Sequence, residues 1–116
     1  MTYEEVVRIA RDAYEDADAR NIFEHIAVQV NVTGEGSGIF YVEVAQRAIC
    51  VEQYDYYDRD AILTMSSDTI VALANSKIRF EDAVEQGLVR IEGNADKVWR
   101  LSAVKPKSWR AKKGKH

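Results

Sequence analysis

Two neighbouring segments in which larger apolar residues recur at every second position constrain the fold of this chain most strongly. The recurring residues are Ile26, Val28, Val30 and Val32 in the first segment and Phe40, Val42 and Val44 in the second. Because side chains alternate between the two faces of a strand, each segment is predicted to be a strand with one buried face. The glycine-rich link 34–38 is interpreted as a turn, and so short a connection favours antiparallel pairing of the two strands.

Shorter apolar runs at 48–52, 60–65 and 88–91 predict further strands. The segment 53–59 between the first two of these runs is polar and rich in tyrosine, and it is interpreted as a loop. The strand-forming segments therefore lie mostly together along the chain, as in an α+β fold rather than an alternating α/β fold.

A helix is predicted at the start of the chain. Thr2 and Glu5 have the spacing of a capping box, in which the first side chain caps the helix and the second reaches back to it. Apolar residues follow at intervals of three and four, which predicts an amphipathic helix over about 2–19.

Short helices are predicted after the strand region. Ser66 lies in a run that offers a helix cap, and apolar positions on either side of 75–79 predict two short helices. Asn94 is predicted to cap a last helix, and Pro106 is expected to end the ordered structure. Together with the strands, this order predicts an α+β fold in which helices gather on one face of a sheet.

The charge of the chain is unevenly distributed. Residues 105–116 contain six basic side chains and no acidic one, although the whole chain has a net charge of −3, so the preceding part is acidic. We expect a single domain over 1–104 and a basic tail over 105–116. Such a tail is either a solvated end, a contact for anionic membrane or a nucleic-acid arm, and the acidic body argues against nucleic acid.

The composition predicts a protein of the cytoplasm. The chain contains one cysteine, no apolar run of the length that a membrane helix needs, and an acidic start unlike a signal peptide. A single cysteine forms no internal disulfide, which agrees with a reducing compartment.

Residue types that usually carry chemistry are few and scattered. His25 is predicted to be structural or at the surface, and Cys50, with no base beside it, to be a core or half-buried thiol. The glycines of 34–38 lack the spacing of a nucleotide-binding loop, and the acidic residues of 55–60 lack that of a calcium loop. No catalytic residue, metal site or cofactor is predicted, and the chain is not expected to be an enzyme.

The segment from Asp60 to Leu101 carries an ordered series of motifs. Asp60-Ala-Ile-Leu-Thr-Met forms a strand, a capped helix with a central leucine follows, and Phe80-Glu-Asp-Ala-Val-Glu-Gln-Gly-Leu-Val-Arg-Ile-Glu-Gly-Asn precedes the last amphipathic helix. This series resembles the sterol-binding domain of the sterol carrier protein type 2 family. The order of the earlier helix and strands agrees with the same resemblance.

The chain departs from the family pattern after the central helix, where Ser76-Lys77 replaces the common Gly-Lys pair. Because serine lacks the freedom of glycine at positive φ, we expect this helix end to be capped differently. Near the last strand, Arg90 is the one basic residue of a common basic pair, and we expect it to point outward. Gly87 is expected to let the chain leave a helix and enter that strand.

The resemblance implies a five-stranded, mainly antiparallel sheet with helices packed on one face, enclosing an apolar cavity. It implies a carrier that binds or transfers a sterol, fatty acid or acyl chain, with an apolar small molecule as its partner. The residues expected to line the cavity are Phe40, Val42, Leu73, Phe80, Val84, Val98 and Trp99. For each of them, a purely structural role in the core is the alternative. The basic tail, with Trp109 as an interfacial anchor, is a hypothetical contact for anionic membrane.

Two other kinds of function stay open. One is a protein-interaction or regulatory domain with a filled core, as a monomer or a homodimer, which exposed tyrosines at Tyr54, Tyr56 and Tyr57 would favour. The other is an enzyme on a small α+β scaffold, which would need a cavity carboxylate with a raised pKa. No carboxylate in the sequence stands out for that role.

Overall fold

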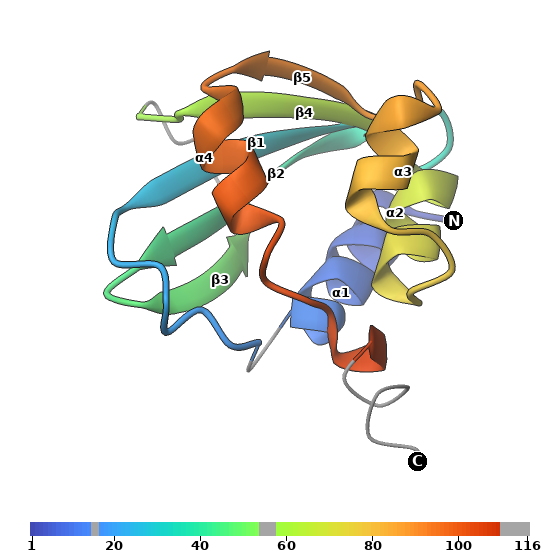
Figure 1. Cartoon of the computed structure of the whole chain (residues 1–116). Helices are drawn as coiled ribbons and strands as arrows, with labels where there is room; N and C mark the ends of the chain where they lie inside the picture. The colour runs from blue at the N-terminus through green and yellow to red at the C-terminus, as the bar shows by residue number, and fades with distance from the viewer. Residues whose placement is uncertain (15–16, 54–57, 110–116) are drawn as a thin grey trace.

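The strands form one mixed sheet in the order β3-β2-β1-β4-β5 in a computed structural model, which describes residues 1–14, 17–53 and 58–109 (Figure 1). The strands are β1 (Ile26–Thr33), β2 (Gly38–Ala45), β3 (Ala48–Glu52), β4 (Ala61–Ser66) and β5 (Arg90–Gly93). Neighbouring strands are antiparallel except β1 and β4, which are parallel. The predicted α+β class and mainly antiparallel sheet are therefore confirmed.

The helices pack against one face of this sheet (Figure 1). They are α1 (Tyr3–Tyr14), α2 (Ser67–Ala74), α3 (Phe80–Glu85) and α4 (Ala95–Leu101). The predicted caps of α2 and α4 are confirmed: Ser66 Oγ accepts the amide of Thr69 at 3.2 Å, and Asn94 Oδ1 accepts the amide of Lys97 at 3.1 Å.

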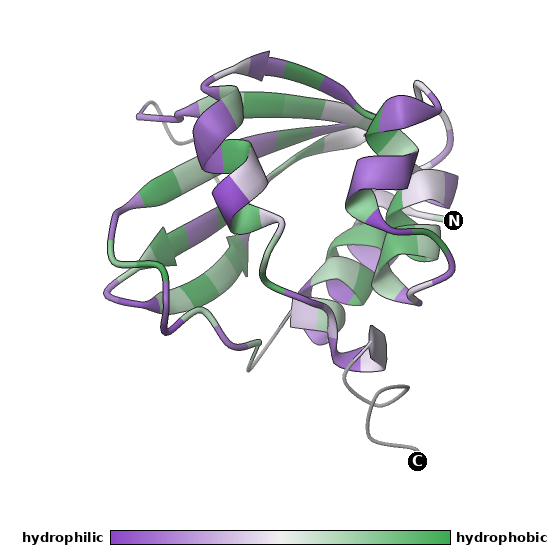
Figure 2. Ribbon diagram, in the orientation of Figure 1, coloured by the Kyte–Doolittle hydropathy of each residue, from purple (hydrophilic) through white to green (hydrophobic). Residues whose placement is uncertain are grey.

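Hydrophobic and hydrophilic residues alternate as bands along the strands in Figure 2, and this alternation gives the sheet an apolar face toward the helices. Val30 of β1 lies opposite both Phe40 of β2 and Leu63 of β4, so these residues form a continuous row across the central strands. The other face carries polar groups, where the Tyr41 hydroxyl donates to Gln29 Oε1 at 3.0 Å. The predicted inward face is confirmed, but the prediction of a single buried face was wrong for β1, where Ala27 and Gln29 on the other face are also buried.

Helix α1 is shorter at its C-terminal end than the predicted 2–19. Its cap is as predicted, because the Thr2 hydroxyl accepts a backbone N–H three residues later at 3.2 Å. The helix ends at Tyr14. Beyond it, the Asp18 carboxylate accepts the backbone N–H of Arg20 at 3.1 Å. Such a local bond between side chain and backbone competes with a helix, which agrees with the non-helical conformation of residues 17–19.

Strand β5 begins at Arg90, two residues later than predicted. The delay comes from the end of α3, where Gly87 has φ +78°. The Gly87 N–H bonds the carbonyl of Val84 at 3.0 Å, and the Leu88 N–H bonds that of Ala83 at 2.9 Å. This pair of bonds is a Schellman motif, so Leu88 still belongs to the helix end. Arg90 is exposed, as expected.

Helix α2 ends with the same motif, so the expectation of a different cap was wrong. The Ser76 N–H bonds the carbonyl of Leu73 at 3.1 Å, and the Lys77 N–H bonds that of Ala72 at 2.9 Å. Ser76 adopts φ +56°, the left-handed conformation that glycine usually supplies. Its hydroxyl lies 2.7 Å from that of Ser108, a contact that glycine would not make.

Ordered structure continues past Pro106, contrary to the expectation. Pro106 is buried, residues 107–109 form a helical turn, and the Trp109 N–H donates to the Pro106 carbonyl at 3.1 Å. The Ser108 hydroxyl donates to the carbonyl of Ala74 at 2.6 Å, which fixes this turn to the end of α2. Proline is tolerated there because the first turn of a helix does not use its N–H. The division between a domain over 1–104 and a tail over 105–116 stays a prediction.

Two predicted features lie outside the described residues. These are the tyrosines Tyr54, Tyr56 and Tyr57 and most of the basic tail. The predictions about a tyrosine-rich surface therefore stay predictions.

Candidate functional site

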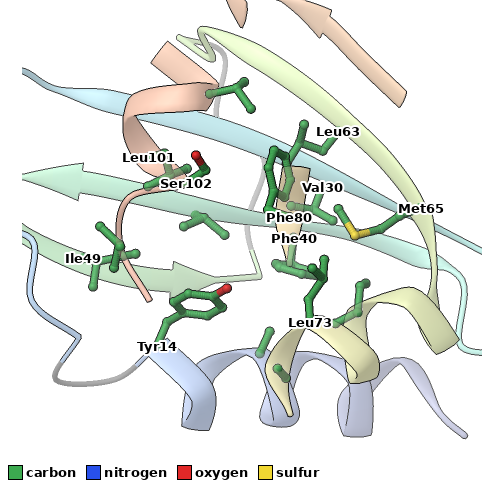
Figure 3. Close-up of a pocket in the computed structure, with 16 residues that line it drawn as sticks. Tyr14, Val30, Phe40, Ile49, Leu63, Met65, Leu73, Phe80, Leu101 and Ser102 are labelled. Atoms are coloured by element: carbon green, nitrogen blue, oxygen red, sulfur yellow. The ribbon is translucent and has the colours of Figure 1, made fainter. Parts of the chain in front are cut away.

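A pocket of about 110 Å³ lies between the sheet and the helices (Figure 3). Its strand residues are Val30, Phe40, Val42, Ile49, Leu63 and Met65. Its remaining residues, from the helices and the segment after α4, are Ala10, Tyr14, Ile70, Leu73, Ala74, Phe80, Val98, Leu101, Ser102 and Val104. Almost all of these side chains are apolar, so the pocket suits hydrocarbon.

The floor of the pocket is the apolar row across the central strands. Val30, Phe40 and Leu63 are 4%, 2% and 6% exposed. They reach the pocket together because directly paired residues of neighbouring strands point to the same face. Phe40 is the largest of the three side chains, so it supplies the largest apolar part of the floor.

The helices supply the opposite wall through residues three or four positions apart. Ala10 and Tyr14 lie on one side of α1, and Ile70 and Ala74 lie on one side of α2. Residues at these spacings share a helix face, which is why each helix presents a stripe to the pocket. Phe80, the first residue of α3, closes the wall near Leu63 in Figure 3.

Five of the seven residues predicted to line a cavity line this pocket, namely Phe40, Val42, Leu73, Phe80 and Val98. Val84 and Trp99 do not line it. Val84 is half-buried and packs against the core from α3. Trp99 is 41% exposed, so it does not fill the core. Its ring stands edge-on to that of Phe80, with centroids 5.5 Å apart, and so supports the wall from outside.

Several lining residues were not predicted although the sequence carried a signal for them. Leu63 and Met65 occupy the apolar phase of the predicted fourth strand, and Ile49 lies in the third. Tyr14 lies on the apolar stripe of the first helix, four residues after Ala10. In each case the periodicity identified the inward face but did not show which inward residues border empty space.

The pocket wall contains two hydroxyl groups, those of Tyr14 and Ser102. None of the described residues that line the pocket is charged. The Ser102 hydroxyl donates to the carbonyl of Trp99 at 2.6 Å, so its proton is already used. Burial raises the pKa of Tyr14 to about 12, because the phenolate form loses its hydration there. Tyr14 is therefore a neutral hydroxyl at physiological pH. Burial of a negative charge at the same place would cost free energy for the same reason.

An ion pair holds α4, which contributes Val98 and Leu101 to the pocket, against the sheet. Lys97 Nζ lies 3.0 Å from Asp60 Oδ1, and Asp60 Oδ2 accepts the backbone N–H of Ala27 at 2.9 Å. Burial acts to raise the pKa of Asp60, but the bonds from Ala27 and Lys97 outweigh it and hold the pKa below the ordinary 3.8. The carboxylate therefore stays ionised and links α4 to β1.

The scattered reactive residues lie away from the pocket. His25 is at the surface, as predicted, and its Nε2 lies 2.6 Å from Glu43 Oε2. Cys50 is exposed, so the prediction of a core or half-buried thiol was wrong. It pairs with Glu43 across the sheet and therefore shares the polar face. Partial burial of the sulfur and the carboxylates of Glu43 and Glu52 raise the pKa of the thiol.

The described ranges 1–14, 17–53 and 58–109 contain neither a metal-binding cluster nor a membrane-spanning helix. No three histidine, cysteine or acidic side chains in these ranges are grouped so that they could hold a metal ion. No helix there has the length and apolar character needed to cross a bilayer.

The fold is similar to that of solved sterol carrier proteins. The crystal structure of sterol carrier protein 2 like 2 from Aedes aegypti has a TM-score of 0.64 at 19% identity and covers 87% of this chain and 94% of that chain. The solution structure of the palmitated SCP2L2 from Aedes aegypti has a TM-score of 0.66 at 18% identity, with coverage of 89% and 93%. At these identities the likeness shows the fold.

The same fold also occurs as a small part of a longer enzyme. The stereoselective inverting sec-alkylsulfatase Pisa1 from Pseudomonas sp. has a TM-score of 0.57 at 13% identity, over 70% of this chain but 13% of that chain. No curated protein matches the chain in sequence. A model of the SCP-2 sterol transfer family matches residues 7–105, which is most of the chain, and the chain therefore belongs to that family.

Proposed function

We propose that this protein binds and carries an apolar molecule, of the class of sterols, fatty acids and acyl chains, in the pocket between its sheet and helices. The observation that carries the proposal is the uncharged wall of the pocket, over a floor of Val30, Phe40 and Leu63. Family membership and the fold shared with a palmitated relative support the same ligand class.

The size of the pocket requires that it opens to admit a whole lipid. Its volume of about 110 Å³ is close to that of an apolar cavity that holds benzene, about 150 Å³, whereas ligand sites are typically about 300–1,000 Å³. Helix α4 is a candidate for this movement, because Val98 is its one buried residue and its polar links, such as the Lys97–Asp60 pair, are not fully buried. Outward movement of α4 would extend the pocket along the sheet.

Apolar burial drives binding in this proposal. A lipid that buries about 400 Å² of apolar surface gains roughly 10 kcal/mol. Association and ordering cost about 4–15 kcal/mol, so the net affinity depends on how little free energy the opening of the pocket requires.

A binding role fits this pocket better than a reaction. Its polar groups are the neutral phenol of Tyr14 and the already bonded hydroxyl of Ser102, and neither has a neighbouring base in the wall. General acid–base chemistry requires a group that exchanges protons near neutral pH. We therefore propose that the chain acts as a carrier and catalyses no reaction in this pocket.

The proposal is tested by native mass spectrometry of freshly purified protein, followed by organic extraction and displacement of a fluorescent fatty acid. Val42→Phe adds a ring inside the pocket and is expected to weaken binding of the fluorescent fatty acid by about 5- to 150-fold, because overpacking costs about 1–3 kcal/mol. Val84→Phe is the matched control, since Val84 is also half-buried but does not line the pocket.

Equal effects of the two variants, or a protein that carries no lipid and binds no fluorescent fatty acid, would contradict the proposal. The remaining interpretation would then be an interaction domain with a filled core, as a monomer or a homodimer. Analytical ultracentrifugation of the same preparation would distinguish these two states.

We also propose that the basic segment from Lys105 onward brings the carrier to anionic membrane in the cytoplasm. Six basic and no acidic side chains in this segment favour contact with an acidic lipid surface. Removal of residues 110–116 leaves the described turn at 107–109 in place. This truncation is expected to weaken sedimentation with vesicles that contain phosphatidylserine, and unchanged sedimentation would remove this part of the proposal.

A further inference from the structure

The hydroxyl of Tyr14 reaches into the pocket from the end of α1. Tyr14 is the last residue of that helix and follows Ala10 on its inward face. In Figure 3 its oxygen points away from the helix and toward the space below Phe40. A polar atom is thereby presented to a space that is otherwise almost entirely hydrocarbon.

This hydroxyl has no hydrogen-bond partner among the residues that the structure describes, whereas comparable hydroxyls in the chain have one. Tyr3 donates to the carbonyl of Ile39, and Tyr41 donates to Gln29 Oε1 at 3.0 Å. Because no buried side-chain nitrogen or oxygen of the described residues lacks a partner, the Tyr14 oxygen lies at the accessible surface of the pocket, where water or a ligand can accept its bond. An unused donor inside a ligand pocket is therefore available to the ligand.

The surroundings of Tyr14 decide which ligand atom can accept that bond. The described wall has no positive side chain to balance an anion, and burial raises the pKa of Tyr14 to about 12. A low-polarity site that disfavours a phenolate disfavours a carboxylate at the same place for the same reason. A hydroxyl, ketone or ester oxygen can accept the bond and brings no charge.

We propose that the Tyr14 hydroxyl is the polar anchor of the pocket and donates a hydrogen bond to an uncharged oxygen of the bound molecule. The inference rests on the proposed function and adds a ligand class to it, namely long apolar molecules that carry a hydroxyl, ketone or ester group. Such molecules bind in preference to hydrocarbons of equal length and to ionised fatty acids.

The test compares three ligands of equal chain length, hexadecane, hexadecan-2-one and palmitate, by displacement of an uncharged fluorescent alkyl probe at about pH 7. Wild-type protein is expected to bind the ketone about fivefold more tightly than the alkane, as one net hydrogen bond provides. Tyr14→Phe removes the oxygen but keeps the ring, and it is expected to abolish this difference. Palmitate is expected to bind more weakly than the ketone and to gain affinity as the pH falls toward its own pKa.

Tyr3→Phe serves as the matched control. Tyr3 lies on the same helix and also donates a hydrogen bond, but it does not line the pocket. This variant is expected to keep the preference for the ketone. Circular dichroism and urea denaturation of both variants show that each is folded under the conditions of the titration.

The outcomes separate the inference from the proposed function. Equal binding of all three ligands by wild-type protein, or an unchanged preference in Tyr14→Phe, overturns the role of Tyr14 and leaves the carrier function standing. Tighter binding of palmitate than of the ketone at about pH 7 overturns the preference for uncharged oxygen. Failure of the probe and of every ligand to bind overturns the proposed function, and this inference with it.

Discussion

Asp60 connects three elements around the pocket, and its replacement tests whether this junction holds α4 in place. Its carboxylate accepts the backbone N–H of Ala27 in β1 at 2.9 Å and the ammonium group of Lys97 in α4 at 3.0 Å. Its own carbonyl accepts the N–H of Asn94, the cap of α4, at 2.9 Å. Asp60→Ala removes both side-chain bonds and keeps the two backbone bonds, to Asn94 and to the Ala27 carbonyl.

The expected loss follows from the two bonds. A backbone N–H bonded to a carboxylate is worth about 1.5–3 kcal/mol, and the low end applies because this bond is only partly buried. The ion pair adds about 0.5–1 kcal/mol, since the side chains of Lys97 and Asp60 are 23% and 22% exposed. Asp60→Ala is therefore expected to lower the free energy of unfolding by about 2–2.5 kcal/mol, and Lys97→Met by about 0.5–1 kcal/mol.

The effect has a defined pH dependence. The pKa of Asp60 is lower in the folded protein than the ordinary 3.8, so the unfolded chain takes up a proton first as the pH falls. The stabilisation from this carboxylate is thus complete above about pH 4 and is lost as the pH falls through the folded pKa. The difference between wild type and Asp60→Ala is expected to shrink over the same range.

Urea denaturation followed by circular dichroism measures the effect, with the midpoint shifted and the slope unchanged. Asp96→Asn is the matched control, because Asp96 is exposed in the first turn of α4 and contributes at most about 0.5 kcal/mol through the helix dipole. A midpoint for Asp60→Ala equal to that of wild type would refute the reasoning. So would a difference that stays constant as the pH is lowered from about 5 to the acid limit at which wild type is still folded.

Further predictions concern the backbone and the thiol. Gly93→Ala is expected to destabilise the fold by about 3 kcal/mol, because the new Cβ would lie 2.7 Å from the Asp60 carbonyl oxygen at φ +95°. Gly34→Ala, at φ +76° with open space around it, is expected to cost only about 1 kcal/mol, and equal losses in urea denaturation would contradict this. The raised pKa of Cys50 is expected to slow its reaction with a disulfide reagent relative to a free cysteine at about pH 8. Glu43→Gln is expected to accelerate that reaction, and an unchanged rate would count against the electrostatic cause.

The strands and the pocket floor could be predicted from the sequence, because side chains at every second position of a strand point to the same face of the sheet. Ile26, Val30 and Phe40 are buried on the phase that the alternation assigns to them. The parallel pairing of β1 with β4 could not be predicted in this way, because it depends on where a longer connection places the strand. The late start of β5 depends on the cap at Gly87, which delays the strand without altering its pattern.

The assignment of individual residues to the pocket was less reliable because faces of short helices are broad. Val98 and Trp99 are consecutive in α4, so their side chains point about 100° apart and only one of them can face the pocket. Val98 takes that position, and Trp99 packs against the outer side of Phe80. A helix of seven residues has too few turns for periodicity to distinguish these two orientations.

The tyrosines explain why the polar end of the pocket could not be predicted from the sequence. Tyr3 and Tyr14 lie on the same helix, and Tyr41 lies on a strand beside Phe40. Whether a phenol is bonded depends on groups that are distant along the chain: Ile39 for Tyr3 and Gln29 for Tyr41. Hydrophobic periodicity records which way a side chain points and contains no information about the partner of its hydroxyl. The free donor of Tyr14 is therefore a property of the assembled fold, because it depends on which groups the fold brings close to the end of α1.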